Sequence, residues 1–220
     1  MLDPDKIEEI FNRLSRKIPE TVTALSYSST FELLIAVMLS ARTTDNIVNK
    51  VTEELFRTAN TPEGILKLGI DRLKFQIKSS GFYNTKANHI METCRILVTK
   101  FNSSVPSDRK NLEDLPGVGR KTANVVLNIA FGESTIAVDT HVFRVANRLG
   151  LAKGKTPMEV ELSLMKLIPI KLLKNAGMLL IIHGRQTCKA RQPQCENCVL
   201  GDLCSFLRES KIRVRTRVKM

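Results

Sequence analysis

The sequence has no hydrophobic run long enough to cross a membrane. Its longest apolar stretch, Phe31 to Leu39, is interrupted by Glu32 and is far shorter than the ~20 residues that span a bilayer. The chain begins with a polar, amphipathic segment, MLDPDKIEEIFNRL, where a secretory signal would have an apolar core and a cleavage site. We therefore expect a cytoplasmic protein that does not bind membranes, and we interpret 31–39 as a buried helix.

Signals for β-structure are missing as well. No alternating strand pattern is followed by a hairpin dipeptide, whereas helix signals occur along most of the chain. Three helix starts are marked by capping residues: Ser29 with Glu32, Thr61 with Pro62, and Thr156 with Glu159. Gly81 and Gly150 are placed where helices end. The sequence therefore predicts an all-α fold of about ten helices.

No internal repeat and no low-complexity linker divides the chain. A length of 220 residues with 43% hydrophobic residues allows one or two domains with a real core. The clearest change of composition is the segment GESTI at 132–136, after which basic residues are more frequent and four of the five cysteines occur. We place a domain division there.

Acidic residues are few relative to basic ones. The 22 Asp and Glu stand against 34 Lys and Arg, which gives a formal charge of +12 and a pI near 9.7. Such a charge favours association with a polyanion, and nucleic acid is the leading candidate. A basic protein without a nucleic-acid role is the alternative, because net charge governs association and not fold.

Two glycines enclose a valine ahead of adjacent cations in LPGVGRKTANVVL, residues 115–127. A helix over 119–131 would have an apolar stripe that faces the core and an opposite, polar face. The stripe contains Ala123, Val126, Leu127 and Ala130, and the polar face contains Lys121, Asn124 and Asn128. Gly117 and Gly119 permit a sharp turn that exposes N–H donors at the positive end of the helix. We predict a phosphate site that holds DNA without reading bases, with an ordinary helix–turn–helix packing corner as the alternative.

The cysteines give a second clear pattern. Four of them are separated by six, two and five residues: Cys188, Cys195, Cys198 and Cys204. Four thiolates in so short a segment suit one metal centre, and their spacing alone is compatible with zinc or with an iron–sulfur cluster. Disulfides are not expected in a cytosolic protein. Cys94 is interpreted as a buried core thiol.

The hairpin phrase resembles the helix–hairpin–helix of the endonuclease III family of DNA-repair glycosylases. The resemblance continues through TIAVDTHVFRVANRLGLA and the C-terminal cysteines, and FELLIAVMLSA and GFYNTKA match upstream. It implies two helical domains with a DNA cleft between them. Residues 22–134 would form a six-helix barrel that contains the hairpin, and residues 1–21 with 135–220 would form the iron–sulfur domain. The resemblance favours a [4Fe–4S] cluster over zinc, in a structural role.

By resemblance, Lys121 is the nucleophile. An amine attacks C1′ of a sugar only when it is unprotonated, and the positive helix end and Arg120 both disfavour the ammonium form. The alternative role for Lys121 is a simple phosphate contact. Asp139 lies directly before a helix that runs to about Leu149, and an N-cap is its ordinary role. By resemblance, Asp139 also supports the positive charge that develops on the sugar.

The family's wedge positions, which fill the space left by a flipped nucleotide, differ here. Arg42 stands where glutamine is common and Phe82 where leucine is common, and their alternatives are a surface arginine and a core aromatic. The segment 177–179 also departs from the family. The other residues that we expect to contact DNA are Gly117, Val118, Gly119, Arg120, His141, Lys189 and Arg191. For Lys189 and Arg191, an exposed surface with no role is the alternative.

The resemblance implies a bifunctional DNA glycosylase and AP lyase that acts in base excision repair. It would remove oxidised pyrimidines from duplex DNA and nick the abasic site by β-elimination through a lysine Schiff base. The expected partner is double-stranded DNA with damaged bases or abasic sites, bound by a monomer at the nucleoid in the cytoplasm. The alternatives are a monofunctional glycosylase for mismatched thymine or adenine and a non-catalytic DNA-binding module.

Overall fold

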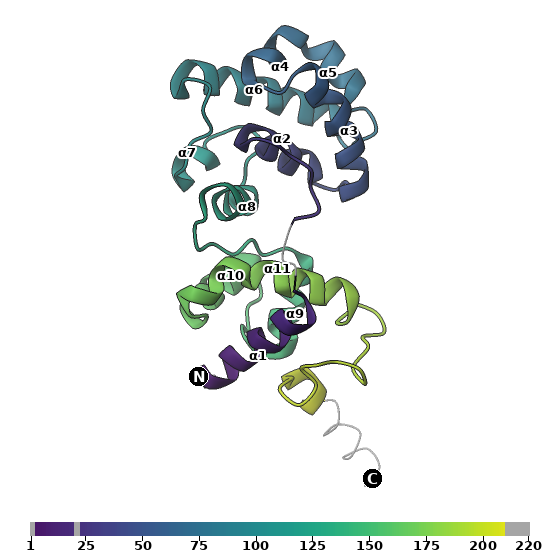
Figure 1. Cartoon of the computed structure of the whole chain (residues 1–220), viewed down its shortest axis with the longest axis vertical. Helices are drawn as coiled ribbons and strands as arrows, with labels where there is room; N and C mark the ends of the chain where they lie inside the picture. The colour runs from purple at the N-terminus through teal and green to yellow at the C-terminus, as the bar shows by residue number, and fades with distance from the viewer. Residues whose placement is uncertain (1–2, 20–22, 210–220) are drawn as a thin grey trace. The chain divides into compact units, whose positions relative to one another are not determined.

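The computed structural model describes residues 3–19 and 23–209. These residues form eleven labelled α-helices, a further helical stretch at 205–209 and no β-strand, which confirms the all-α fold class (Figure 1). Within the described residues, no helix combines the length and the apolar composition that a membrane span requires. The chain forms two compact units, one of residues 23–133 and one that combines the residues before 23 with those from 134 onward.

The first unit, residues 23–133, is called the hairpin unit. Its helices are α2 (Thr30–Ser40), α3 (Asp45–Thr58), α4 (Pro62–Leu68), α5 (Ile70–Gln76), α6 (Tyr83–Phe101), α7 (Arg109–Glu113) and α8 (Arg120–Phe131). Helix α2 is its centre, because every residue from 31 to 39 is buried and α3, α6 and α8 pack around it (Figure 1). The expectation of a buried helix at 31–39 is therefore confirmed.

The second unit is called the cysteine unit and combines residues 3–19 with 134–209. Its helices are α1 (Pro4–Lys17), α9 (Thr140–Leu149), α10 (Pro157–Leu167) and α11 (Ile170–Gln186). Helix α11 packs against both α9 and α1. Apolar residues of all four helices form a core of their own, which includes Phe11, Val145, Leu164 and Leu180. Residues 187–204, called the cysteine loop, follow α11 without a further helix.

The predicted helix starts are correct. Ser29, Thr61 and Thr156 each cap their helix by accepting a hydrogen bond from a backbone N–H three residues later. The two glutamates of the capping boxes are also engaged, since Glu32 accepts from the N–H of Ser28 at 2.5 Å and Glu159 accepts from the N–H of Lys155 at 2.8 Å. Both glutamates therefore bond one residue ahead of the cap.

One predicted helix end is right and one is wrong. Gly150 ends α9 in the left-handed conformation, with φ of 79°. Gly81 does not end a helix, because α5 already stops at Gln76 and Gly81 lies in the connection to α6. A Cβ at position 81 would lie 3.2 Å from the carbonyl oxygen of Arg42. This glycine therefore serves a close approach between two loops.

Candidate active site

The hairpin joins α7 to α8 through a tight turn. The N–H of Val118 donates to the carbonyl of Leu115 at 3.0 Å, and Gly117 has φ of 78°. A Cβ at position 117 would also lie 2.8 Å from Nδ1 of His89. Both the backbone angle and the close side chain therefore require glycine at this point.

Helix α6 supports the turn through a side-chain hydrogen bond. The Thr93 hydroxyl is buried and donates to the carbonyl of Pro116 at 3.0 Å. Val118 is also buried, with 3% of its surface exposed, so its side chain belongs to the core of the hairpin unit. Its N–H is engaged by the carbonyl of Leu115, so little of Val118 is open to the DNA contact that the sequence predicts.

Helix α8 starts with an N-cap that has no side chain. Gly119 makes no side-chain cap hydrogen bond, and a Cβ added there would meet no atom within 4 Å. Lys121 follows in the first turn and is exposed, whereas Arg120 is half-buried. The exposed amine thus stands directly beside the glycine turn, at the positive end of the helix dipole.

The apolar stripe of α8 is confirmed, but its polar face is partly wrong. Ala123, Val126 and Leu127 are buried, and Ala130 packs against the same core. Asn124, which we expected beside Lys121 on the exposed face, is fully buried. Its side-chain oxygen accepts a hydrogen bond from the guanidinium of Arg109 on α7. The pattern misleads here because a buried amide with a charged donor from a neighbouring helix is tolerated.

Asp139 is the N-cap of α9 in the cysteine unit. Its Oδ1 accepts hydrogen bonds from the N–H groups of His141 and Val142, both at 2.8 Å. His141 is half-buried, and its Nδ1 lies 3.2 Å from the guanidinium of Arg144. Lys121 and Asp139 therefore each lie at the start of a helix, one in each unit.

Two loops of the hairpin unit bring Arg42 and Phe82 together. The guanidinium of Arg42 lies over the ring of Phe82, 5.2 Å from its centroid. Phe82 is 61% exposed, so the alternative of a core aromatic is wrong. Lys86, a buried residue of α6, donates from Nζ to the carbonyl of Leu39 at 2.7 Å and to the hydroxyl of Thr43 at 2.9 Å. Sequence analysis did not single out Lys86, although it lies in the quoted segment GFYNTKA.

The four C-terminal cysteines line one pocket, which is partly open to solvent. Burial and the charges of neighbouring cysteines raise the pKa of the Cys195 and Cys198 thiols. Binding to a metal reverses that effect, because the ligand is the thiolate. Cys94 is fully buried in the other unit, where burial raises its thiol pKa to about 12. Its assignment as a core thiol is confirmed.

The residues present fit an iron–sulfur cluster. All four thiols line the same pocket. A [4Fe–4S] cluster is held by four cysteine thiolates, so the number and the chemistry of these side chains suit it.

Two arginines of α9 hold the cysteine loop against that helix by hydrogen bonds to its backbone. Arg144 donates from Nε to the carbonyl of Cys188 at 3.0 Å, and Arg148 donates to the carbonyls of Lys189 and Ala190 at 2.7 and 3.0 Å. Lys189 is therefore held through its backbone while its side chain stays exposed. Neither arginine was singled out from the sequence, although their four-residue spacing puts them on one helix face.

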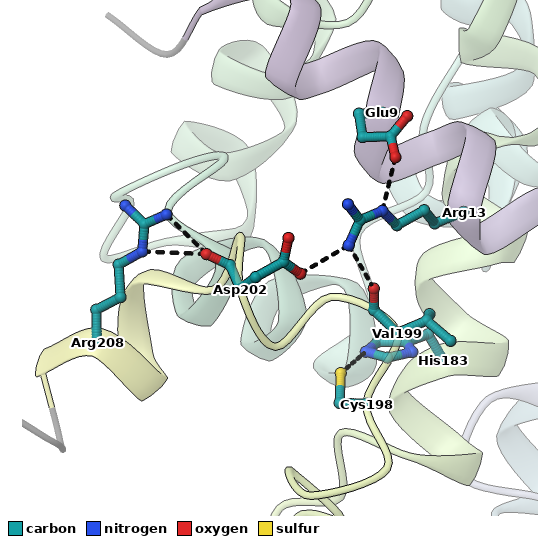
Figure 2. Close-up of polar contacts among 7 residues, drawn as sticks. All are labelled: Glu9, Arg13, His183, Cys198, Val199, Asp202 and Arg208. Atoms are coloured by element: carbon teal, nitrogen blue, oxygen red, sulfur yellow. Dashed lines mark hydrogen bonds and ion pairs between the residues drawn. The ribbon is translucent and has the colours of Figure 1, made fainter.

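Helix α1 holds the C-terminal part of the cysteine loop (Figure 2). Arg13 donates from Nη1 to the carbonyl of Val199 at 3.1 Å and to the carboxylate of Asp202 at 2.7 Å. The guanidinium lowers the pKa of the Asp202 carboxyl. His183 of α11, which is 3% exposed, places Nε2 3.9 Å from Sγ of Cys198. His183 is therefore a core residue, and its neighbour is a thiol of the pocket.

Comparison with known proteins identifies two matching families. The HhH-GPD superfamily of base excision DNA repair proteins matches residues 35–170. The iron–sulfur binding domain of endonuclease III matches residues 188–204, from the first to the last cysteine of the pocket. The cofactor prediction is confirmed, and the chain carries a [4Fe–4S] cluster.

Named relatives agree over most of the chain. Endonuclease III of Haemophilus influenzae and that of Escherichia coli K12 are each 54% identical over 198 residues, which cover 90% of this chain and 94% of each relative. A trapped endonuclease III–DNA covalent intermediate, an estranged-adenine complex, has a TM-score of 0.89 and 43% identity, covering 96% of this chain and 100% of that one. A thermostable thymine-DNA glycosylase has a TM-score of 0.78 and 27% identity, covering 92% and 95%. The resemblance found in the sequence is therefore confirmed, and the chain belongs to the endonuclease III family of the HhH-GPD superfamily.

Proposed function

We propose that this enzyme removes oxidised pyrimidines from duplex DNA and nicks the resulting abasic site, with Lys121 as nucleophile and Asp139 as its electrostatic partner. As a member of the endonuclease III family, the chain is a bifunctional DNA glycosylase and AP lyase of base excision repair that binds DNA. The observation that carries the assignment of roles is the exposed Lys121 amine in the first turn of α8, directly after the glycine turn.

The reaction starts with a nucleotide flipped out of the duplex. A damaged base stacks weakly and is therefore easier to extrude. The neutral Lys121 amine attacks C1′ as the glycosidic bond breaks, and the base leaves with the bonding electrons and takes up a proton. Loss of a proton from the nitrogen and ring opening give a Schiff base. Removal of a C2′ proton then breaks the C3′–O bond, which nicks the strand 3′ to the lesion.

Asp139 stabilises this reaction through its negative charge. Positive charge develops on the sugar as the base departs, and a fixed carboxylate lowers the energy of that state. The two N–H bonds that Asp139 accepts at the start of α9 hold the carboxylate in one orientation. The same bonds leave Oδ2 for proton transfer.

The remaining residues hold the DNA backbone. We assign phosphate contacts to the backbone N–H groups of Gly117 and Gly119 and to Arg120, and further contacts to His141, Lys189 and Arg191. The exposed side chains of Lys189 and Arg191 and the exposed glycine turn support this assignment, since phosphate contacts position a protein without reading bases. Such a protein acts as a monomer at the nucleoid, where its substrate lies.

The ligands of the cluster are assigned to the four cysteines that line the pocket. When bound, the cluster supplies iron–thiolate bonds that order the cysteine loop. The chain itself contributes Arg144, Arg148 and Arg13, which fix the loop backbone at both ends. Replacing Cys198 with alanine is expected to remove iron and the absorbance near 400 nm. A variant that kept both would contradict this assignment.

Borohydride trapping tests the role of Lys121. Borohydride reduces a Schiff base and leaves a stable covalent protein–DNA adduct, so the native enzyme on DNA with thymine glycol or an abasic site is expected to give one. Lys121→Ala is expected to abolish the adduct. Lys110→Ala is the matched control, because Lys110 is an exposed lysine on the other helix of the same hairpin. An adduct that survives in Lys121→Ala, or none in the native enzyme, would refute the proposal.

A glycosylase specific for mismatched thymine is the second candidate. The structural likeness to a thermostable thymine-DNA glycosylase favours it, whereas the lysine at position 121 favours a lyase. A panel of duplexes, each with one oxidised base or one mismatch, separates the two. Excision of mismatched thymine with no activity on thymine glycol would select the mismatch enzyme.

A further inference from the structure

A hollow opens on the surface of the hairpin unit between helix α3 and the segment that leads into α2. It holds about 410 Å³ of space, which lies within the size range of small-molecule sites. Its lining comes from residues 26–28, from the first turn of α2 and from one face of α3. None of the lining residues is assigned above to catalysis, to DNA or to the cluster. The hollow is therefore a second candidate site.

Glu32 is a buried charge in this lining, with 6% of its surface exposed. Its Oε2 accepts a hydrogen bond from the N–H of Ser28, and within the described residues no group donates to Oε1. Among these residues, Gln76 holds the one buried side-chain atom that lacks a partner, so Oε1 of Glu32 is reached by solvent. An acceptor with negative charge is therefore open to a ligand.

Thr52 is the second buried polar side chain of the lining and is 1% exposed. Its hydroxyl donates to backbone carbonyls of its own helix, at 3.0 Å to Val48 and at 3.2 Å to Asn49, so its oxygen can only accept a further hydrogen bond. Another hollow of this unit, between α6 and the hairpin, has no buried polar side chain in its lining. In the hollow beside α3, both buried polar groups require a ligand that donates.

The charges around the hollow favour a cation. Its charged side chains are Glu32, Glu53 and Arg57, and the Arg57 guanidinium is ion-paired with Glu53. Glu32 is therefore left without a countercharge within the described residues. The lining also reaches the last turn of α3, where the backbone carbonyls carry partial negative charge. The positive end of α2 is already capped by Ser29.

Two aromatic side chains indicate that the cation is organic. Tyr27 and Phe56 both line the hollow, and Tyr27 is 40% exposed. An ammonium near an aromatic face is attracted by the ring quadrupole, and methylene groups next to it bury apolar surface on the same rings. A metal ion gains less from such a lining, because Ca²⁺, for example, takes about six to eight oxygen ligands.

We propose that this hollow binds a small aliphatic amine, whose ammonium group donates to Glu32 and Thr52 while its methylene chain packs against Tyr27 and Phe56. The inference goes beyond the proposed function, because the site needs neither DNA nor a damaged base. Aliphatic diamines and polyamines are cations of this kind, and a polyanion such as DNA gathers cations around it. The formal charge of +12 disfavours cations elsewhere on the protein, so binding depends on this local site.

Titration with putrescine tests the site. The full chain with its cluster is titrated by calorimetry at constant ionic strength, and a single saturable transition with a Kd below about 1 mM is expected. Butanediol has the same chain without the charges and is expected to bind at least about tenfold more weakly, as is magnesium chloride. Amide NMR signals of residues 26–28 and of Thr52 are expected to shift during the putrescine titration.

Glu32→Gln removes the charge and keeps the helix start, because glutamine also serves in a capping box. The affinity for putrescine is expected to fall at least about tenfold. Glu54→Gln is the matched control, since Glu54 is an exposed glutamate of α3 outside the lining, and it should change the affinity by less than about twofold. Thr52→Val is expected to weaken binding about two- to tenfold.

Tyr27→Leu tests the site at an exposed position, where the fold does not depend on the side chain. Loss of the ring is expected to weaken putrescine binding about two- to fivefold. Urea unfolding of each variant shows whether it is folded under the conditions of the titration. This variant keeps the test decisive even if the change at Glu32 destabilises the protein.

Three results would overturn the inference. They are the absence of saturable putrescine binding, equally tight binding of butanediol or magnesium, and native affinity in both Glu32→Gln and Tyr27→Leu. None of these titrations contains DNA, so their outcome is independent of the excision and trapping assays. A protein that binds putrescine in this way but excises no oxidised pyrimidine would support the site and refute the proposed substrate class.

Discussion

Helices α8 and α9 begin at the two candidate catalytic positions but satisfy their first N–H groups in opposite ways. The N-cap of α8 is Gly119, which provides no side-chain acceptor. The N-cap of α9 is Asp139, whose carboxylate accepts two backbone N–H bonds. Every helix start carries partial positive charge. The first arrangement leaves that charge to an external anion, and the second uses it to hold a carboxylate in place.

The difference shows that a helix N-terminus can either bind an external anion or orient a carboxylate of the chain. A DNA phosphate can bind α8 because no side chain from the cap competes for the same donors. At α9 the donors are occupied, and the helix contributes an oriented negative charge instead. The helices that begin at Thr61 and Thr156 resemble α9 in having side-chain caps. Helix α5, whose N-cap is Gly69, resembles α8 in having a glycine cap without a side-chain hydrogen bond.

Replacing Asp139 is expected to have the largest effect on excision. Two different substitutions separate its role as a helix cap from the role of its negative charge. Asparagine caps a helix about as well as aspartate, so Asp139→Asn should leave stability nearly unchanged and lower single-turnover excision at least about a hundredfold. Asp139→Ala should show the same loss of excision and also cost about 1 kcal/mol of unfolding free energy. Urea unfolding and excision kinetics measure both. Full activity in Asp139→Asn would reduce this residue to a cap.

Gly117→Ala should damage the hairpin itself. Alanine at φ of 78° is strained, and its Cβ would come within 2.8 Å of His89. The strained backbone is expected to cost about 1–3 kcal/mol in the free energy of unfolding, and the displaced turn should weaken DNA binding. Chemical unfolding and fluorescence anisotropy with labelled duplex test this. Native stability would show that the turn tolerates a side chain.

Thr156→Ala removes an N-cap that has no catalytic role and serves as the comparison for Asp139. Thr156 accepts from the N–H of Glu159 at the start of α10, and loss of this bond should lower the free energy of unfolding by about 1 kcal/mol. Excision and DNA affinity should not change at a temperature where the protein stays folded. If activity fell as far as in Asp139→Asn, loss of a cap alone would explain the effect at α9.

Gly119→Ser should give the smallest effect, and stability and DNA affinity should change in opposite directions. Position 119 has extended backbone angles that suit a cap and open space for a side chain. A serine there is expected to stabilise the protein by roughly a few tenths of a kcal/mol. It should also weaken DNA binding by about two- to fivefold, because its oxygen competes for the N–H groups. Tighter binding in this variant would contradict a phosphate site at α8.

Much of the candidate site was predictable because its signals are local. Helix starts were read from Ser29, Thr61, Thr156 and Asp139, since a cap and the N–H that it accepts lie within three residues. The glycine turn before Lys121 and the spacing of the cysteines are local patterns of the same kind. Each of these predictions depends on residues that are neighbours in the chain, whatever the rest of the molecule does.

Contacts between distant residues could not be predicted in this way. Asn124 was placed on the exposed face of α8, and the structure buries it against Arg109. Lys86, 47 residues from the carbonyl that it binds, carries no signal in its own neighbourhood that distinguishes it from a surface lysine. Arg144 and Arg148, which hold the cysteine loop, are separated in sequence by more than 40 residues from the carbonyls that they bind. Their partners are backbone carbonyls, which every residue type supplies.

The sequence by itself therefore determined the helices, their caps, the glycine turn, the exposed lysine and the four-cysteine segment. Tertiary structure alone decided which polar side chains are buried, which loops meet, and how Arg42 is laid over Phe82. The physical reason is that capping and turn formation satisfy backbone groups within one turn of chain. Burial and cross-helix hydrogen bonds depend instead on which segments pack together.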